Sequence, residues 1–194
     1  MFLKEKENQR SPMLSAVSRS HLVVIDMQER FATAIPGLAN AADRAAILCQ
    51  AATLCKVPVL VTQQNSKVLG ETVSALRDSL PASATRFEKM CFSAFDLPEA
   101  AEEFRAQKRM QFILCGIEAH VCVLQTALDL LENLGAQVMV VRDAVASRRD
   151  ADRDAAFTRM AAVGVQLVTS EMVAFEWLRK AGNPEFKAIQ ALIK

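Results

Sequence analysis

The chain has 194 residues, a length that suits one ordinary domain and allows a sizeable hydrophobic core. Its 23 basic and 22 acidic residues nearly cancel, so the net charge of +1 gives no electrostatic reason to expect binding to nucleic acid or to a membrane surface. No apolar run approaches the roughly 18 residues needed to span a bilayer, and the first 20 residues lack the apolar core of a secretory signal. We therefore expect a flexible N-terminal arm over residues 1–20 and one globular domain over residues 21–194.

The cysteines and histidines favour a reduced protein without a metal. Five cysteines, with no CxxC pair and no secretory signal, are typical of free thiols in a cytoplasmic protein. The sequence has two histidines, His21 and His120, so a zinc site would lack its usual ligands. We expect no metal and no cofactor.

The first half of the chain predicts three strands with helices between them. In chain order, the expected elements are a strand over residues 22–25, a helix over 38–55, a strand over 57–62, a short helix near 73–78 and an edge-like strand over 85–89. The first strand is a β-branched run that ends at Asp26, which indicates a fully buried strand. The first helix carries its small and apolar residues on one face, which indicates packing against a sheet.

The second half continues the alternation. It predicts a helix over residues 98–108, a strand over 111–115, a helix over 119–134, a strand over 138–141, a helix over 152–163, a strand over 165–168, a helix capped by Ser170, and a short tail after Pro184. Uniformly apolar strands that alternate with helices indicate a parallel sheet covered on both faces. We expect a three-layer α/β/α, doubly wound fold whose six-stranded parallel sheet has the common order 3-2-1-4-5-6.

Three candidate catalytic residues lie at the ends of predicted strands. Asp26 ends the first strand, Lys89 lies at the end of the third, and Cys122 follows the fourth. In such sheets, ligands bind outside the carboxyl ends of the strands, where the strand order reverses. A thiol beside a proton acceptor and a cation is an activated nucleophile. Cys122 is expected in the first turn of a helix, where free N–H groups and the helix dipole stabilise a thiolate or an oxyanion.

Each of these residues alone also fits a structural role. An aspartate that closes a buried strand is often a turn former, an isolated lysine is usually solvated, and a free cysteine is commonly a core residue. The joint placement of Asp26, Lys89 and Cys122 at three strand ends favours a catalytic site over three unrelated structural residues.

Two motifs resemble those of the isochorismatase-like cysteine hydrolases. Residues 24–31, which read VIDMQERF, resemble the D-x-Q-x-x-F opening of that family. Residues 116–123, which read GIEAHVCV, resemble its second signature. Residues 61–64, 142–147 and 169–171 are similar to the subgroup of small isochorismatase-domain proteins. The resemblance covers nearly the whole chain from His21 onward and implies the same doubly wound fold.

The resemblance also implies roles for particular residues. Asp26, Lys89 and Cys122 would form a triad in which the aspartate takes the thiol proton, the lysine positions the aspartate, and the cysteine attacks a carbonyl to form a thioester. A cis peptide between Ile117 and Glu118 would aim the N–H groups of Glu118 and Cys122 at the oxyanion.

Three further residues are expected at the substrate pocket. Phe31 matches an aromatic pocket position, and His120 and Val121 are expected to face the pocket, with a subunit neighbour as the alternative for His120. A Cys–His pair is the less favoured alternative, because residues two apart on a helix do not face each other.

A departure from part of the family narrows the expected chemistry. Nicotinamidases carry a metal-binding aspartate and histidines after the second strand, whereas residues 63–67 read QQNSK here. We therefore expect neither metal binding nor nicotinamidase activity.

The expected function is hydrolysis of a small amide or a related acyl compound by a homo-oligomer. The alternatives are a catalytically silent binding or scaffold protein and, with little support from the near-neutral charge, a ribonuclease.

Overall fold

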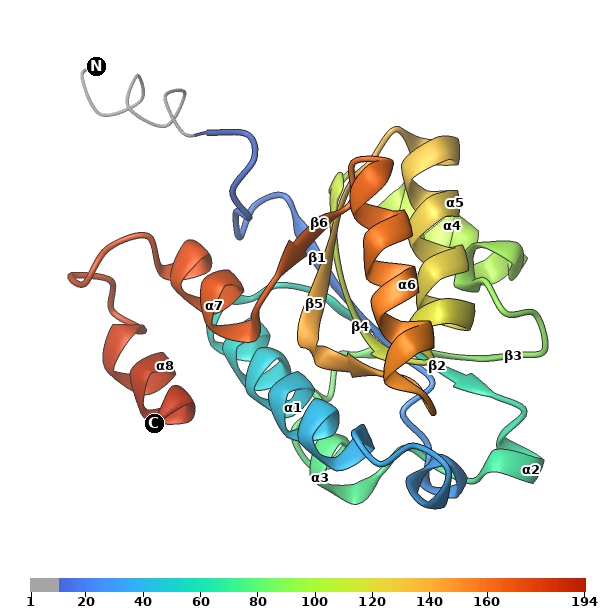
Figure 1. Ribbon diagram of the computed structural model, residues 1–194. Coiled ribbons are helices and arrows are strands. Elements are labelled where there is room, and N and C mark those ends of the chain that lie inside the picture. Colours follow the sequence, from blue (N-terminus) through green and yellow to red (C-terminus); the bar gives the residue numbers. More distant parts are fainter. Residues whose placement is uncertain (1–10) are drawn as a thin grey trace.

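A computed structural model describes residues 11–194 of the chain (Figure 1). Its sheet has six parallel strands in the order β3-β2-β1-β4-β5-β6. The strands are β1 (Ser20–Ile25), β2 (Val59–Gln64), β3 (Thr85–Lys89), β4 (Gln111–Ile117), β5 (Gln137–Ala146) and β6 (Gln166–Val168). The predicted doubly wound fold and its strand order are confirmed.

Helices cover both faces of the sheet, as Figure 1 shows. One face packs against α1 (Leu38–Cys55) and α7 (Ser170–Leu178), and α8 (Phe186–Ile193) packs against these two helices. The other packs against α4 (Pro98–Ala106), α5 (Leu124–Leu134) and α6 (Asp150–Ala162). The short elements are η2 (Glu29–Thr33), α2 (Ser66–Leu69), α3 (Ser74–Arg77), η3 (Ala94–Asp96) and the π-turn η4 (Ala119–Val123).

The two layers explain why the central strands are apolar at every position. Side chains alternate between the faces of a strand, so Leu22 and Val24 join the core under α1, while Val23 and Ile25 join the core under α5. All four are fully buried. A strand that is buried on both faces cannot alternate between apolar and polar residues.

Two of the differences from the predicted elements concern the surroundings of Cys122 and the end of the chain. The helix expected over residues 119–134 is divided into η4 and α5, so Cys122 lies in a π-turn before the α-helix begins. The tail expected after Pro184 forms α8, because Phe186, Ile189 and Ile193 recur at helical spacing and pack against the core under α1.

Residues 1–10 of the expected N-terminal arm lie outside the described part of the chain. Residues 11–19 run along the sheet, where the Ala16 N–H donates to Gln111 Oε1 at 2.9 Å and the Ser15 N–H donates to Glu176 at 2.6 Å. Ser20 is already the first residue of β1, and its hydroxyl accepts a hydrogen bond from the Trp177 indole at 3.0 Å.

Candidate active site

Asp26 and Lys89 form a buried ion pair at the carboxyl ends of the strands. Asp26 directly follows β1, and Lys89 is the last residue of β3. Lys89 Nζ lies 2.6 Å from Asp26 Oδ2, and the two side chains are 0% and 1% exposed. The solvated-lysine alternative is therefore wrong.

The Lys89 ammonium is surrounded by oxygen acceptors. Besides Asp26, its Nζ donates to Gln64 Oε1 at 2.9 Å and to the carbonyl oxygens of Cys91 at 3.1 Å and Phe92 at 3.0 Å. Water is replaced around the charge by a carboxylate, an amide and two peptide carbonyls. A buried ammonium needs partners of this kind, because a charge removed from water is costly unless it is paired and hydrogen-bonded.

Asp26 is fixed on its second oxygen and through its backbone. Thr62 donates its hydroxyl proton to Asp26 Oδ1 at 2.7 Å, and the Asp26 N–H donates to the Thr62 carbonyl at 3.1 Å. The backbone of Asp26 is left-handed, with φ of 54°, so the chain turns sharply as it leaves β1. Thr62 and Lys89 thus bind different oxygens of the same carboxylate and leave it little freedom to rotate.

Two glutamines that the sequence alone did not single out, the buried Gln28 and the half-buried Gln64, support this network. Gln28 Nε2 donates to the carbonyls of Gln64 at 3.0 Å and Gly70 at 2.8 Å, while its Oε1 accepts the Gln64 N–H at 2.8 Å. Gln64 in turn contacts Lys89. A usable signal was present, because Thr62 and Gln64 are polar residues at the end of a strand that otherwise reads as core.

Cys122 completes the group as a protonated thiol. Its residue is 7% exposed. Burial, followed by the charge of Asp26, raises the pKa of Cys122 to about 12. The charge of Lys89 lowers this pKa in part. Hydrogen bonding to Asp26 also raises the pKa, and hydrogen bonding to Lys89 also lowers it. The thiol is thus within the influence of both charges. This direction is opposite to the stabilised thiolate expected at the start of a helix, because burial and the Asp26 carboxylate together outweigh Lys89.

The raised pKa of Cys122 predicts how its alkylation varies with pH. Because iodoacetamide reacts with the thiolate, its rate at Cys122 should rise about tenfold per pH unit from about 7 to about 10, without a plateau. Tandem mass spectrometry of quenched samples measures this rate separately from the other cysteines. Asp26→Asn, which removes the nearby negative charge, should speed the reaction at each pH. A plateau below about pH 9 would contradict the assignment.

Gly116 allows the strand that leads to Cys122 to approach β1. It pairs with Ile25 and has φ of 135°. A Cβ atom at this position would lie 2.1 Å from the Ile25 carbonyl oxygen. One residue further along, the peptide bond between Ile117 and Glu118 is cis, at the position that the resemblance implies. Beyond it, the N–H groups of Val121 and Val123 donate to the Glu118 carbonyl at 3.1 and 3.2 Å and shape the turn around Cys122.

The three expected pocket residues lie in different surroundings. Val121 is half-buried and packs against the same core as Cys122. Phe31 lies in η2, half-buried against the core under α1. His120 is half-buried, and its Nδ1 lies 3.1 Å from Ser147 Oγ, so the ring is held by Ser147. Their contact with a substrate stays a prediction.

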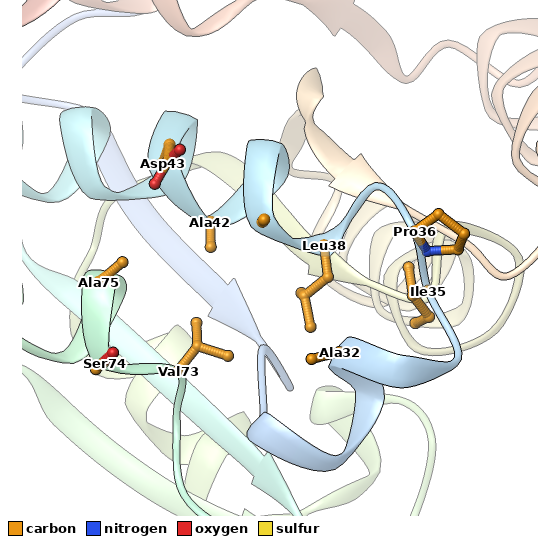
Figure 2. A pocket seen from close by; sticks show the side chains of 10 residues that line it. Ala32, Ile35, Pro36, Leu38, Ala42, Asp43, Val73, Ser74 and Ala75 are labelled. Carbon is orange, nitrogen blue, oxygen red and sulfur yellow. The ribbon is translucent and has the colours of Figure 1, made fainter.

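A separate apolar pocket lies between η2, α1 and α3 (Figure 2). It is lined by Ala32, Ile35, Pro36, Leu38, Ala39, Ala42, Asp43, Val73, Ser74 and Ala75. These residues include no member of the Asp26, Lys89 and Cys122 group and none of the expected pocket residues, so this pocket does not coincide with the candidate site.

Two absences hold for residues 11–194, the part of the chain that the structure describes. No three histidine, cysteine, aspartate or glutamate side chains among them are grouped as metal ligands would be. Within the same range, every helix is too short or too polar to cross a bilayer.

Known proteins match the chain over most of its length. The profile of a family described as Isochorismatase domain matches residues 20–172. Isochorismatase domain-containing protein 2A of Mus musculus is 40% identical over 177 residues, which cover 90% of this chain and 82% of the relative. The secreted isochorismatase effector Isc1 of Phytophthora sojae is 40% identical over 179 residues, with 90% and 84% covered. The solved structure of MAR1 ribonuclease from Caenorhabditis elegans is 39% identical, has a TM-score of 0.88, and covers 93% of this chain and 92% of its own.

Proposed function

Because this chain belongs to the isochorismatase domain family, we propose that it is a metal-independent cysteine hydrolase that cleaves a small amide or a related acyl compound. The observation that carries the proposal is the meeting of an acid, an ammonium and a thiol. Lys89 lies 2.6 Å from Asp26, and both charges act on the ionisation of Cys122. A nucleophile paired with a base that a third group orients is the arrangement used for covalent catalysis.

In the proposed acylation step, Cys122 Sγ attacks the carbonyl carbon while its proton passes to Asp26. The carbonyl oxygen becomes an oxyanion, which accepts hydrogen bonds from the backbone N–H groups of Glu118 and Cys122. Asp26 then gives the proton to the leaving amine, the carbon–nitrogen bond breaks, and a thioester remains on Cys122. Lys89 stays protonated and holds Asp26 in position throughout.

In the proposed deacylation step, Asp26 takes a proton from a water molecule, which attacks the thioester. The carbon–sulfur bond breaks, the acid product leaves, and the proton returns to Cys122. The raised pKa of Cys122 gives Asp26 a necessary task, because a thiol that is protonated at neutral pH needs a base during the attack.

A screen of small amides and esters tests the proposal. The wild-type protein is expected to release acid product from at least one compound, and Cys122→Ala is expected to fall to the uncatalysed rate. The variant removes only a sulfur from a nearly buried position, so thermal melting should show that it remains folded. Equal turnover by the two proteins would reject Cys122 as the nucleophile.

A catalytically silent binding or scaffold role is the second candidate, and the raised pKa of Cys122 favours it. It predicts that no compound in the screen is hydrolysed and that no acyl group becomes attached to Cys122. Turnover that depends on Cys122 excludes it.

A ribonuclease role is a third candidate, because a relative that is 39% identical is named a ribonuclease. The net charge of +1 offers little attraction to phosphates. Incubation with single-stranded RNA tests it. Strand cleavage by the wild type that is lost in Cys122→Ala would replace the amide proposal, while intact RNA would remove the ribonuclease candidate.

We also propose that the protein forms a homo-oligomer. Met90 and Phe92, on either side of Cys91 and close to Lys89, are 71% and 53% exposed, which supports contact with another surface. Light scattering would measure the assembly, and a monomer would exclude it.

The expected cytoplasmic location stays a prediction, and one relative is named a secreted effector.

A further inference from the structure

Two side-chain bridges connect the turn that carries Cys122 to the residues that follow β5. The Glu118 carboxylate accepts the Arg148 backbone N–H at 2.9 Å and the Arg148 Nε–H at 3.1 Å. His120 Nδ1 lies 3.1 Å from the buried Ser147 Oγ. The proposed catalytic steps use neither bridge.

The bridges begin where the pairing of the strands stops. The last paired residues of β4 and β5 are Ile117 and Ala146. Glu118 comes directly after the first of these, and Ser147 and Arg148 come directly after the second. The bridges therefore hold the segments that follow β4 and β5 together beyond the end of the sheet, as far as the π-turn.

Glu118 is attached to its surroundings at both its side chain and its backbone. Its side chain is 9% exposed, whereas that of Arg148 is 60% exposed. A nearly buried carboxylate needs hydrogen-bond donors, and bonds to an ionised group are stronger than neutral ones. Its carbonyl meanwhile accepts the N–H groups of Val121 and Val123. The Glu118 side chain therefore helps to fix the Glu118 peptide group at the start of the turn.

We propose that Glu118, through its bonds to Arg148, is a positioning residue that fixes the N–H groups of Glu118 and Cys122 where the oxyanion forms. This inference rests on the proposed function, because it assigns a support to the same site. Glu118 thus acts through its backbone on the reacting oxygen and through its carboxylate on the geometry of the turn. Arg148 is the partner that holds the carboxylate.

If Glu118 positions the oxyanion donors, two reactions of Cys122 Sγ should respond differently to its loss. Acylation by p-nitrophenyl acetate passes through an oxyanion, whereas alkylation by iodoacetamide displaces iodide at a saturated carbon and forms none. Loss of oxyanion positioning slows the first reaction and leaves the second unchanged. A merely structural role of Glu118 would alter both, because a loosened turn changes the exposure and ionisation of Cys122.

The experiment measures both rates at Cys122 in the full-length protein, with Cys122→Ala as the blank. Glu118→Ala is expected to slow acylation by about 10- to 100-fold, since small displacements of a reacting group cost this much. Glu118→Gln keeps an acceptor for the Arg148 N–H and should lose less, as should Arg148→Ala. Alkylation is expected to stay within about twofold of the wild type in all three.

Arg153→Ala is the matched control, because it also removes a guanidinium paired with carboxylates, here Asp150 and Asp154 on α6. It should change neither rate. Acylation at the wild-type rate in Glu118→Ala, or equal loss of acylation and alkylation in every Glu118 and Arg148 variant that melts normally, would overturn the inference. If wild-type Cys122 is acylated no faster than a free thiol, the proposed function fails first, and the inference falls with it.

Discussion

Lys89→Met is expected to abolish turnover and to lower the free energy of unfolding by roughly 3–5 kcal/mol. The variant removes the ammonium from a cluster of four oxygen acceptors and leaves Asp26 as a buried carboxylate without its cation. Such a carboxylate is costly to keep charged, and a protonated one is no longer a base for Cys122. Chemical denaturation and the hydrolysis screen measure the two effects.

A second variant separates the cost of leaving the Asp26 charge unpaired from the cost of losing the lysine side chain. The double substitution Asp26→Asn with Lys89→Met removes both charges, so it should regain most of the stability while activity stays absent, because replacing a whole buried pair is often nearly neutral. A Lys89→Met protein within about 1 kcal/mol of the wild type would show that the ion pair is not the buried, desolvated contact described here.

Gly116→Ala is expected to cost at least about 3 kcal/mol of stability and to remove activity. The new Cβ would lie 2.1 Å from the Ile25 carbonyl oxygen, which is backbone and cannot rotate away. The φ of 135° adds strain for any residue with a Cβ. Since Ile25 precedes Asp26 and Gly116 precedes the Glu118 turn, separating the two strands would also separate the base from the nucleophile. Denaturation and the activity screen measure the result.

Gly135→Ala is the control for the backbone strain alone. Gly135 also has positive φ, at 59°, but a Cβ there meets no atom within 4 Å. This variant should lose about 1 kcal/mol and keep its activity. Equal costs at the two glycines would contradict the claim that close packing of β1 and β4 sets the geometry of the site.

The sequence was sufficient to predict the sheet and the position of the candidate site. Strands buried on both faces must be apolar throughout, and their alternation with helices favours a doubly wound sheet, for which 3-2-1-4-5-6 is a common strand order. This order places the carboxyl ends of β1 and β4 side by side, which is why Asp26 could be predicted to lie near the segment that carries Cys122. The third strand placed Lys89 on the same edge of the sheet, and the family resemblance implied its pairing with Asp26.

Other properties depended on contacts between distant segments. Thr62 and Gln64 are unremarkable polar residues until Asp26 and Lys89 are placed against them. The pKa of Cys122 depends on how completely the folded chain excludes water, which no local pattern reports, and the start of a helix suggested the opposite shift.

A covalent bond to Cys122 is the central step of the proposed hydrolysis. We expect that a reaction with p-nitrophenyl acetate, quenched in acid during its first turnover, will add one acetyl group to the wild-type protein. Fragmentation should place that group on the Cys122 sulfur, and Cys122→Ala should carry none there. Hydrolysis that proceeds while Cys122 remains unmodified at every sampled time would contradict the account.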